Sequence, residues 1–150
     1  MARRSANGKD ATTYKPIIDW VVRDLNLGDM IIRYRFKNYG SGGTATQFPD
    51  GTCLAEINNA LTDRTIRHTI AHELRHIWQF KHNYNRDTWD GNQQVKIWRM
   101  GDSFVRMPVK EVNRLFTKRT REYDDLPWEK DANDYADRVL SDLILIPTRS

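Results

Sequence analysis

Apolar and polar residues recur with two different periods along the first part of the chain, and these periods predict a helix followed by a strand. Over residues 14–27, apolar residues return every three or four positions. Pro16 stands near the start of this segment and Gly28 follows it, which is typical of helix boundaries. Over residues 30–36, apolar residues alternate with arginines, which predicts a strand with one exposed face.

Two shorter strands are expected at residues 44–48 and 52–57, joined by a turn, and they lead into the longest helical pattern of the chain. This helix is expected at residues 62–81, with Thr62 or Asp63 as its N-cap. Its apolar residues fall within about a third of the helix circumference, so one side should be buried. They are Ile66, Ile70, Leu74, Ile77 and Trp78.

The segment that follows predicts a loop and a hairpin. Residues 82–94 are polar and rich in turn formers, and we interpret them as a long loop. Residues 95–100 and 103–109 predict two strands around Gly101-Asp102, a pair that suits a two-residue turn.

Two helices are expected at the end of the chain. The first, at residues 109–121, is basic and amphipathic, and its charged residues are interpreted as a solvated face. The second begins near Pro127 and ends at Pro147. The expected inward residues of the first helix are Val112, Leu115 and Phe116, and the expected cap of the second is Asp124 or Asp125. This order of elements predicts an α+β fold in one domain, residues 1–150, with residues 1–13 as a loose tail.

Composition limits the classes of protein to which the chain can belong. Its 150 residues, 39% hydrophobic and 29% charged, suit one globular domain with a core of its own. No apolar run reaches the length of a membrane span and the N-terminus has no apolar signal segment, so we expect a cytoplasmic protein without a membrane partner. The single Cys53 excludes an internal disulfide, which fits a reducing compartment. A net charge of +4 permits a nucleic-acid partner without requiring one.

The candidate chemistry lies in His72-Glu73-Leu74-Arg75-His76, inside the long predicted helix. Residues four apart lie on one face of a helix, so His72 and His76 can bind one Zn²⁺ together. Glu73 can then reach a metal-bound water as general base. By the same angular argument, both histidines lie nearly opposite the apolar side of the helix, facing a cleft.

A zinc site needs a third protein ligand, and two other histidines are candidates. His68 continues the row, but it lies about 12 Å from His76 along the helix axis, too far to share an ion with it. His82 has the spacing of the last ligand in the metzincin pattern His-Glu-x-x-His-x-x-Gly-x-x-His. Gln79 stands where that pattern has its helix-breaking Gly, so a continuing helix would turn His82 about 240° away from His76. His82 stays an alternative third ligand.

Two carboxylates near the start of the last predicted helix complete the set of candidates. Glu129 lies at the N-terminal end of the apolar side of that helix. Burying a carboxylate there costs free energy unless it is paired or binds a metal. Asp131 projects roughly the opposite way. We therefore favour Glu129 as the third ligand.

With this set the chain resembles the gluzincin branch of zinc metallopeptidases, and most closely its small intracellular ImmA/IrrE-like and phage-encoded members. The resemblance rests on the His-Glu-x-x-His sequence and on Glu129-Lys130-Asp131-Ala132-Asn133-Asp134-Tyr135-Ala136, followed by the hydrophobic stretch before Pro147. The long interval between His76 and Glu129 departs from the family pattern.

The resemblance implies a minimal zincin-like domain that hydrolyses protein or peptide substrates. It places an N-terminal helix behind a small mixed sheet, whose edge strand at residues 53–57 borders the cleft and can bind an extended peptide. In such a site a further donor stabilises the oxyanion, and Tyr84, Tyr123, Tyr135 and the arginines stay candidates. The alternatives are a zincin-shaped module that binds protein or nucleic acid without proteolysis, and a structural zinc site with four protein ligands.

Overall fold

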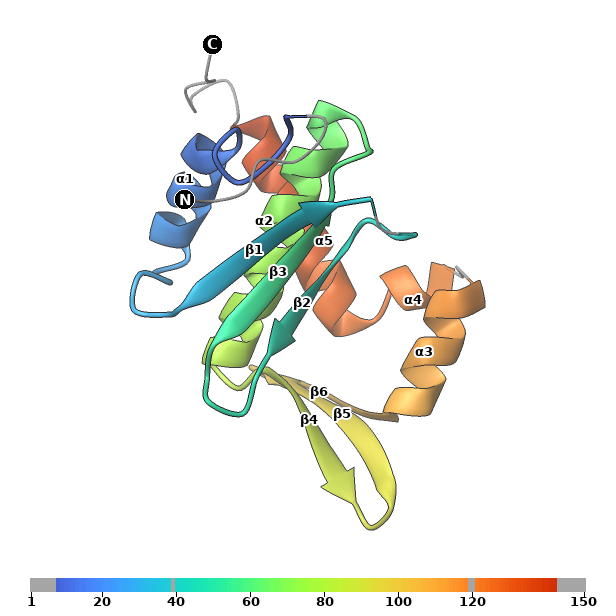
Figure 1. Ribbon diagram of the computed structural model, residues 1–150. Coiled ribbons are helices and arrows are strands. Elements are labelled where there is room, and N and C mark those ends of the chain that lie inside the picture. The colour runs from blue at the N-terminus through green and yellow to red at the C-terminus, as the bar shows by residue number, and fades with distance from the viewer. Residues whose placement is uncertain (1–7, 39, 119–120, 143–150) are drawn as a thin grey trace.

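The computed structural model describes residues 8–38, 40–118 and 121–142, and within them five helices and two three-stranded sheets form a mixed α+β fold (Figure 1). The predicted fold class is therefore confirmed. In chain order the elements are α1 (Lys15–Asp24), β1 (Ile32–Lys37), β2 (Gly43–Gln47), β3 (Cys53–Asn58), α2 (Asp63–Lys81), β4 (Asn85–Asp90), β5 (Gln93–Met100), β6 (Ser103–Pro108), α3 (Val109–Lys118), α4 (Arg121–Asp124) and α5 (Pro127–Ser141).

The first sheet has the strand order β1-β3-β2, with β1 and β3 parallel and β2 antiparallel to β3. In β1 the apolar residues are half-buried while the alternate Arg33 and Arg35 are exposed, as the sequence predicts. The prediction that residues 53–57 form an edge strand is wrong. β3 is the central strand because its residues are the most apolar of the three and are buried on the inner face, and β2 occupies the edge instead.

Helices α1, α2 and α5 lie together on one face of the first sheet (Figure 1). The main hydrophobic core fills the space between these helices and the sheet. At its centre α2 contributes side chains to both the sheet and α5, so this helix is largely buried. Thr62 caps its N-terminus by accepting from the Thr65 N–H, and the helix ends at Lys81, close to the predicted boundaries. Buried residues of this core include Ile17, Val21, Leu27, Ala55, Ile57, Ile66, Ile70, Leu74, Ile77 and Ala136.

The second sheet has the order β4-β5-β6 and projects away from the first. The interpretation of residues 82–94 as a loop is wrong, because β4 pairs with β5 over its whole length. Only Asn85 of β4 is fully buried, so the strand has no apolar alternation and is formed by backbone pairing with β5. The predicted hairpin around Gly101-Asp102 is confirmed, with Gly101 at a positive φ of 59°. A smaller core of Trp98, Val112, Leu115, Leu126 and Trp128 joins this sheet to α3 and α5.

The helices at the end of the chain differ from the predictions in three respects. Phe116 is not inward, since it is 48% exposed while Val112 and Leu115 are buried. The N-cap of α5 is Leu126, without a side-chain hydrogen bond, so neither Asp124 nor Asp125 caps this helix. Helix α5 ends at Ser141, and the hydrophobic stretch before Pro147 lies outside the described residues.

The N-terminal segment is also more structured than expected. Residues 1–7 lie outside the described residues, but the turn that precedes α1 packs on the domain instead of forming part of a loose tail. Asp10 is buried and accepts from the N–H groups of Thr12 and Thr13, and Lys9 donates to the Leu61 carbonyl. Across the described parts of the chain, no helix combines the length and the apolar character that crossing a membrane requires.

Gly43 is the point where β2 passes closest to α2, and it provides a test of this packing. A Cβ at position 43 would clash with the Glu56 carbonyl oxygen and would lie 2.8 Å from Thr69 Cγ2. Because a backbone atom cannot move aside cheaply, we expect Gly43→Ala to lower the free energy of unfolding by about 1–3 kcal/mol in urea titrations. Gly42→Ala is the matched control, since its Cβ would meet only Thr69 Oγ1 at 3.8 Å. Equal losses in the two variants would contradict this account.

Candidate metal centre

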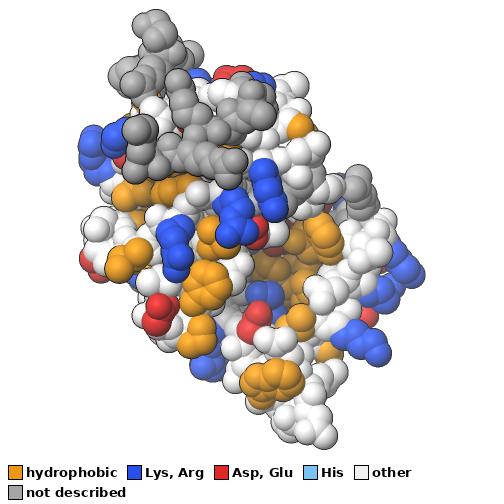
Figure 2. All heavy atoms as spheres, viewed as in Figure 1, with side chains coloured by type: hydrophobic (Ala, Val, Ile, Leu, Met, Phe, Trp, Pro, Cys, Tyr) orange, Lys and Arg blue, Asp and Glu red, His pale blue; other side chains and the backbone are white. Residues whose placement is uncertain are grey.

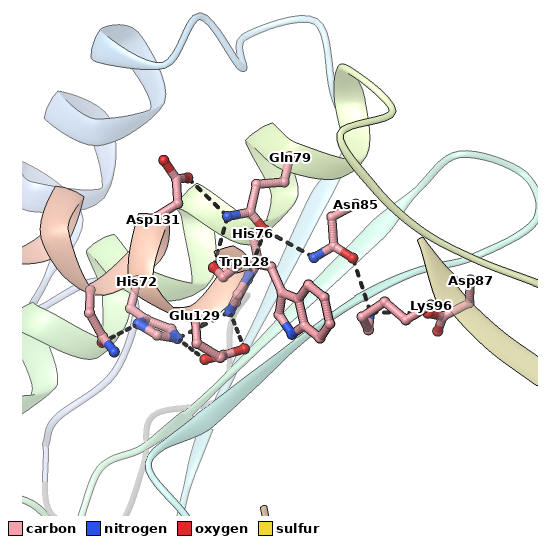
Figure 3. A network of polar contacts seen from close by, with 10 residues as sticks. His72, His76, Gln79, Asn85, Asp87, Lys96, Trp128, Glu129 and Asp131 are labelled. Atoms are coloured by element: carbon pink, nitrogen blue, oxygen red, sulfur yellow. Dashed lines mark hydrogen bonds and ion pairs between the residues drawn. The ribbon is translucent and has the colours of Figure 1, made fainter. Parts of the chain in front are cut away.

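Helices α2 and α5 pack against each other and bring His72, His76 and Glu129 together. The Nε2 atoms of His72 and His76 are 3.1 Å apart. Glu129 Oε1 lies 3.1 Å from His72 Nε2, and Glu129 Oε2 lies 3.2 Å from His76 Nε2. The predicted carboxylate thus meets both predicted imidazoles, as Figure 3 shows.

The spacing of these atoms fits a tetrahedral zinc ion. With zinc–ligand distances near 2.0–2.1 Å, neighbouring ligand atoms in a tetrahedron are about 3.3 Å apart. The two Nε2 atoms are 3.1 Å apart, and each of them lies 3.1 or 3.2 Å from a different oxygen of Glu129, so the separations are close to that value. The residues present therefore fit the metal that the sequence suggested.

The outer nitrogen of each imidazole has a partner that orients the ring. His72 Nδ1 lies 2.8 Å from Asn133 Oδ1, and His76 Nδ1 lies 2.8 Å from Gln79 Oε1. An amide oxygen only accepts hydrogen bonds, so each Nδ1 carries a hydrogen. The Nε2 atom of each ring is then the atom that can bind a metal. Both Nε2 atoms and the Glu129 carboxylate thus face one point, where a metal ion can contact all three side chains.

Two glutamates at the site are in opposite electrostatic environments. Burial raises the pKa of Glu73 to about 7, although His72 opposes the rise and Glu129 adds to it. Burial would also raise the pKa of Glu129, but the charges and hydrogen bonds of His76 and His72 hold it well below its usual range. Glu129 is thus ionised, as a metal-binding carboxylate must be, and Glu73 is a group that can exchange a proton near neutral pH.

Glu73 is also near enough to reach the same ion. The potential ligand atoms of His72, Glu73 and His76 all lie within 4.8 Å of one another. Glu129, however, contacts both imidazoles directly, and its ionised state suits a metal ligand better. We therefore assign the ligand position to Glu129 and leave Glu73 beside it.

A cavity of about 480 Å³ opens in front of these side chains. Figure 2 shows a hollow on this face of the molecule, beside the first sheet, with apolar side chains in its walls. Its walls come from β2, α2, the second sheet and the segment from α3 to α5. Its apolar lining includes Ala45, Phe80, Val112, Phe116, Tyr123 and Trp128.

The other candidate ligands lie elsewhere. His68 lines the outer part of the cavity, but its Nε2 contacts Asp137 at 3.0 Å. His82 is the C-cap of α2 and packs against Trp78 and Tyr84, so the alternative third ligand is not brought to the site. Asp131 projects away from Glu129 as expected, yet it still reaches α2, where it accepts from Arg75 and Gln79.

Sequence reasoning missed the roles of two residues of the site and left a third, Tyr123, among several candidates. Gln79 and Asn133 orient the imidazoles, and each stands within one helical turn of a ligand, a spacing that could have indicated them. Tyr123 lines the cavity, and burial, the charges of Glu129 and Glu73 and a hydrogen bond to Glu129 raise its pKa above the usual range. No sequence pattern singles it out from Tyr84 and Tyr135, which pack against His82 and donate to Asp24 respectively.

No family model, curated protein or solved structure matches this chain.

Metal content tests the ligand set. We expect the wild-type protein to retain about one zinc ion per chain after dialysis, and His76→Ala and Glu129→Ala to lose it, because three protein ligands are the minimum for such a site. His82→Ala is the matched control, being a histidine at the end of the same helix, and it should retain the metal. Loss of zinc from His82→Ala together with retention by Glu129→Ala would overturn the assignment.

Proposed function

We propose that the protein is a zinc-dependent metallopeptidase that hydrolyses peptide bonds in an extended protein or peptide substrate. The observation that carries this proposal is the convergence of His72, His76 and Glu129 at one point, with the buried Glu73 beside them. A structural zinc site would use a fourth protein ligand, a position for which Glu73 is near enough, and would have no open position for a substrate. An open cavity in front of the ligands favours catalysis instead.

The edge of β2 supports a peptide as the substrate. The Asn58 N–H donates to the Gly42 carbonyl and the Phe48 N–H to the Thr52 carbonyl, so the even-numbered residues of β2 face β3. In an antiparallel pair, the alternate, odd-numbered residues then direct their backbone N–H and C=O groups away from the partner strand. Gly43 and Ala45 therefore offer unpaired hydrogen-bonding groups along the cavity, where an extended peptide can add as a further strand.

Each residue of the site has a separate role in the proposed hydrolysis. When bound, zinc would supply a Lewis acid that polarises the scissile carbonyl and acidifies a water molecule. Glu73 accepts the proton of that water and later donates it to the leaving amine, a role that suits a carboxyl with a pKa near 7. Asn133 and Gln79 keep the imidazoles oriented throughout.

Tyr123 is the best placed donor for the oxyanion. Its hydroxyl hydrogen-bonds to Glu129, and its raised pKa keeps it protonated, so that it can donate. A donor beside the ligand set can stabilise the negative charge that develops on the former carbonyl oxygen.

The alternative is a module that binds a partner without hydrolysis. The exposed side chains of Arg33, Arg35 and Lys37 form a row on the face of the first sheet opposite the helices, which favours an anionic partner such as nucleic acid. Absence of hydrolysis by the zinc-loaded protein, together with salt-dependent retention on DNA, would favour this alternative.

Substitution of Glu73 tests the peptidase proposal. Glu73→Gln should retain zinc but lower kcat by about 10²–10⁴-fold, because the amide cannot accept the proton of the water. The assay is cleavage of a quenched fluorescent peptide library alongside metal analysis, with Glu111→Gln, a change on the exposed face of α3, as the control. Full activity of the Glu73→Gln variant would exclude the role of general base.

Substitution of Tyr123 tests the oxyanion donor. Tyr123→Phe should lower kcat by about 10²–10³-fold with little change in KM and with zinc retained, because the hydroxyl acts only as charge develops. Tyr84→Phe, whose ring packs against His82, is the matched control and should leave both constants unchanged. A change confined to KM in the Tyr123 variant would show that the hydroxyl binds substrate instead.

A further inference from the structure

We propose that Asn85 and Lys96, in the second sheet, are positioning residues for His76, and that they act on it through the buried amide of Gln79. This inference rests on the proposed metal site, and it makes the second sheet a part of that site. Both residues line the cavity, and the hydrogen bonds that connect them to the site run from Lys96 to Asn85 and from Asn85 to Gln79.

Four side chains form a continuous line from the second sheet to the metal ligand (Figure 3). Lys96 Nζ donates to Asn85 Oδ1 at 3.0 Å. Asn85 Nδ2 donates to Gln79 Oε1 at 2.9 Å. His76 Nδ1 approaches the same Gln79 oxygen at 2.8 Å.

The ammonium group of Lys96 determines which group donates and which accepts in every hydrogen bond of this line. An ammonium group can only donate, so the Asn85 oxygen faces Lys96 and the Asn85 NH₂ group faces Gln79. Gln79 must then present its oxygen, and an oxygen that accepts requires a hydrogen on His76 Nδ1. In the neutral ring, the Nε2 atom of His76 is consequently left with its lone pair toward Glu129 and His72.

The other half of the Gln79 amide imposes the same orientation independently. Gln79 Nε2 donates to the Trp128 carbonyl at 3.0 Å and to Asp131 Oδ2 at 2.9 Å, and both of these groups can only accept. The amide therefore makes all four of the hydrogen bonds that it can form. Trp128 directly precedes Glu129, so one side chain sets the orientation of His76 and holds the backbone next to the third ligand.

Burial makes a reversed amide costly. Gln79 is 0% exposed and Asn85 is 2% exposed, so neither can turn its amide toward water. A reversed Gln79 would set its oxygen against the Trp128 carbonyl and the Asp131 carboxylate, and buried oxygens without donors are destabilising. Lys96 also forms a 3.0 Å ion pair with the exposed Asp87 and lies 5.6 Å from the centre of the Trp128 ring.

The test uses the tautomer of His76, which can be observed without any metal. In the metal-free wild-type protein, two-bond ¹H–¹⁵N NMR correlations, recorded at a pH where they show neutral rings, should find the His76 hydrogen on Nδ1. Asn85→Asp keeps the shape of the side chain and its bond from Lys96, but it sets a carboxylate oxygen against Gln79 Oε1. We expect this variant to lose the single Nδ1–H tautomer and to bind zinc about 10–100-fold more weakly in a chelator competition.

Two controls separate positioning from general damage to the sheet. Gln93→Glu makes the same amide-to-acid change at an exposed position of β5 and should leave the tautomer and the zinc affinity unchanged. Asp87→Asn removes the exposed partner of Lys96 but keeps the bond from Lys96 to Asn85, and it should behave likewise.

If Asn85→Asp does not fold, a second variant tests whether this line of hydrogen bonds orients His76. Lys96→Met removes the donor that fixes Asn85 and should shift the His76 tautomer in the same direction, and Lys96→Arg should restore it. An unchanged tautomer and zinc affinity in whichever variant folds would overturn the proposal, even if that variant were less stable. If the wild-type protein binds no zinc, the proposed function fails, while the tautomer still tests this inference.

Discussion

The fold depends on the cost of burying a carboxylate between two helices. Glu129 is 6% exposed in the first turn of α5, and an ionised group there is tolerated only if its charge is balanced. Its partners are the two imidazoles of α2, so α5 must dock in one position along that helix. Small residues such as Ala71, Ala132 and Ala136 allow the close approach, and the sheet behind α2 holds that helix in place.

The two buried glutamates, Glu73 and Glu129, lie at the same site but have pKa values shifted in opposite directions. Glu129 lies against both imidazoles, and they hold its pKa below the usual range. Glu73 sits on the same helix as those imidazoles but points toward β2, where it gains less compensation for its burial. Their pKa values are therefore driven apart without any change of residue type. The ligand and the proposed base differ in their surroundings alone.

Much of the fold could be predicted from the sequence, because the period of the apolar residues is a local signal. The limits of α2, the exposed arginines of β1 and the side of α5 that carries Glu129 all follow from such periods. Strand β4 could not be predicted, since its stability comes from a neighbour and not from its own residues. The position of β3 at the centre of the sheet and the exposure of Phe116 also depend on contacts between distant segments, which a local pattern does not encode.

His72 and Glu129 are 57 residues apart in the chain, and this separation has a consequence for the order of events during folding. A growing chain that has completed α2 possesses two imidazoles but no third ligand until α5 has been synthesised and has docked. The second sheet, which supplies the partners of Gln79, lies between them in sequence and must also form first. Such a centre matures late, because long-range contacts close after local ones. A hydrolase assembled in this way would stay inactive while its own chain is still unfolded and open to cleavage.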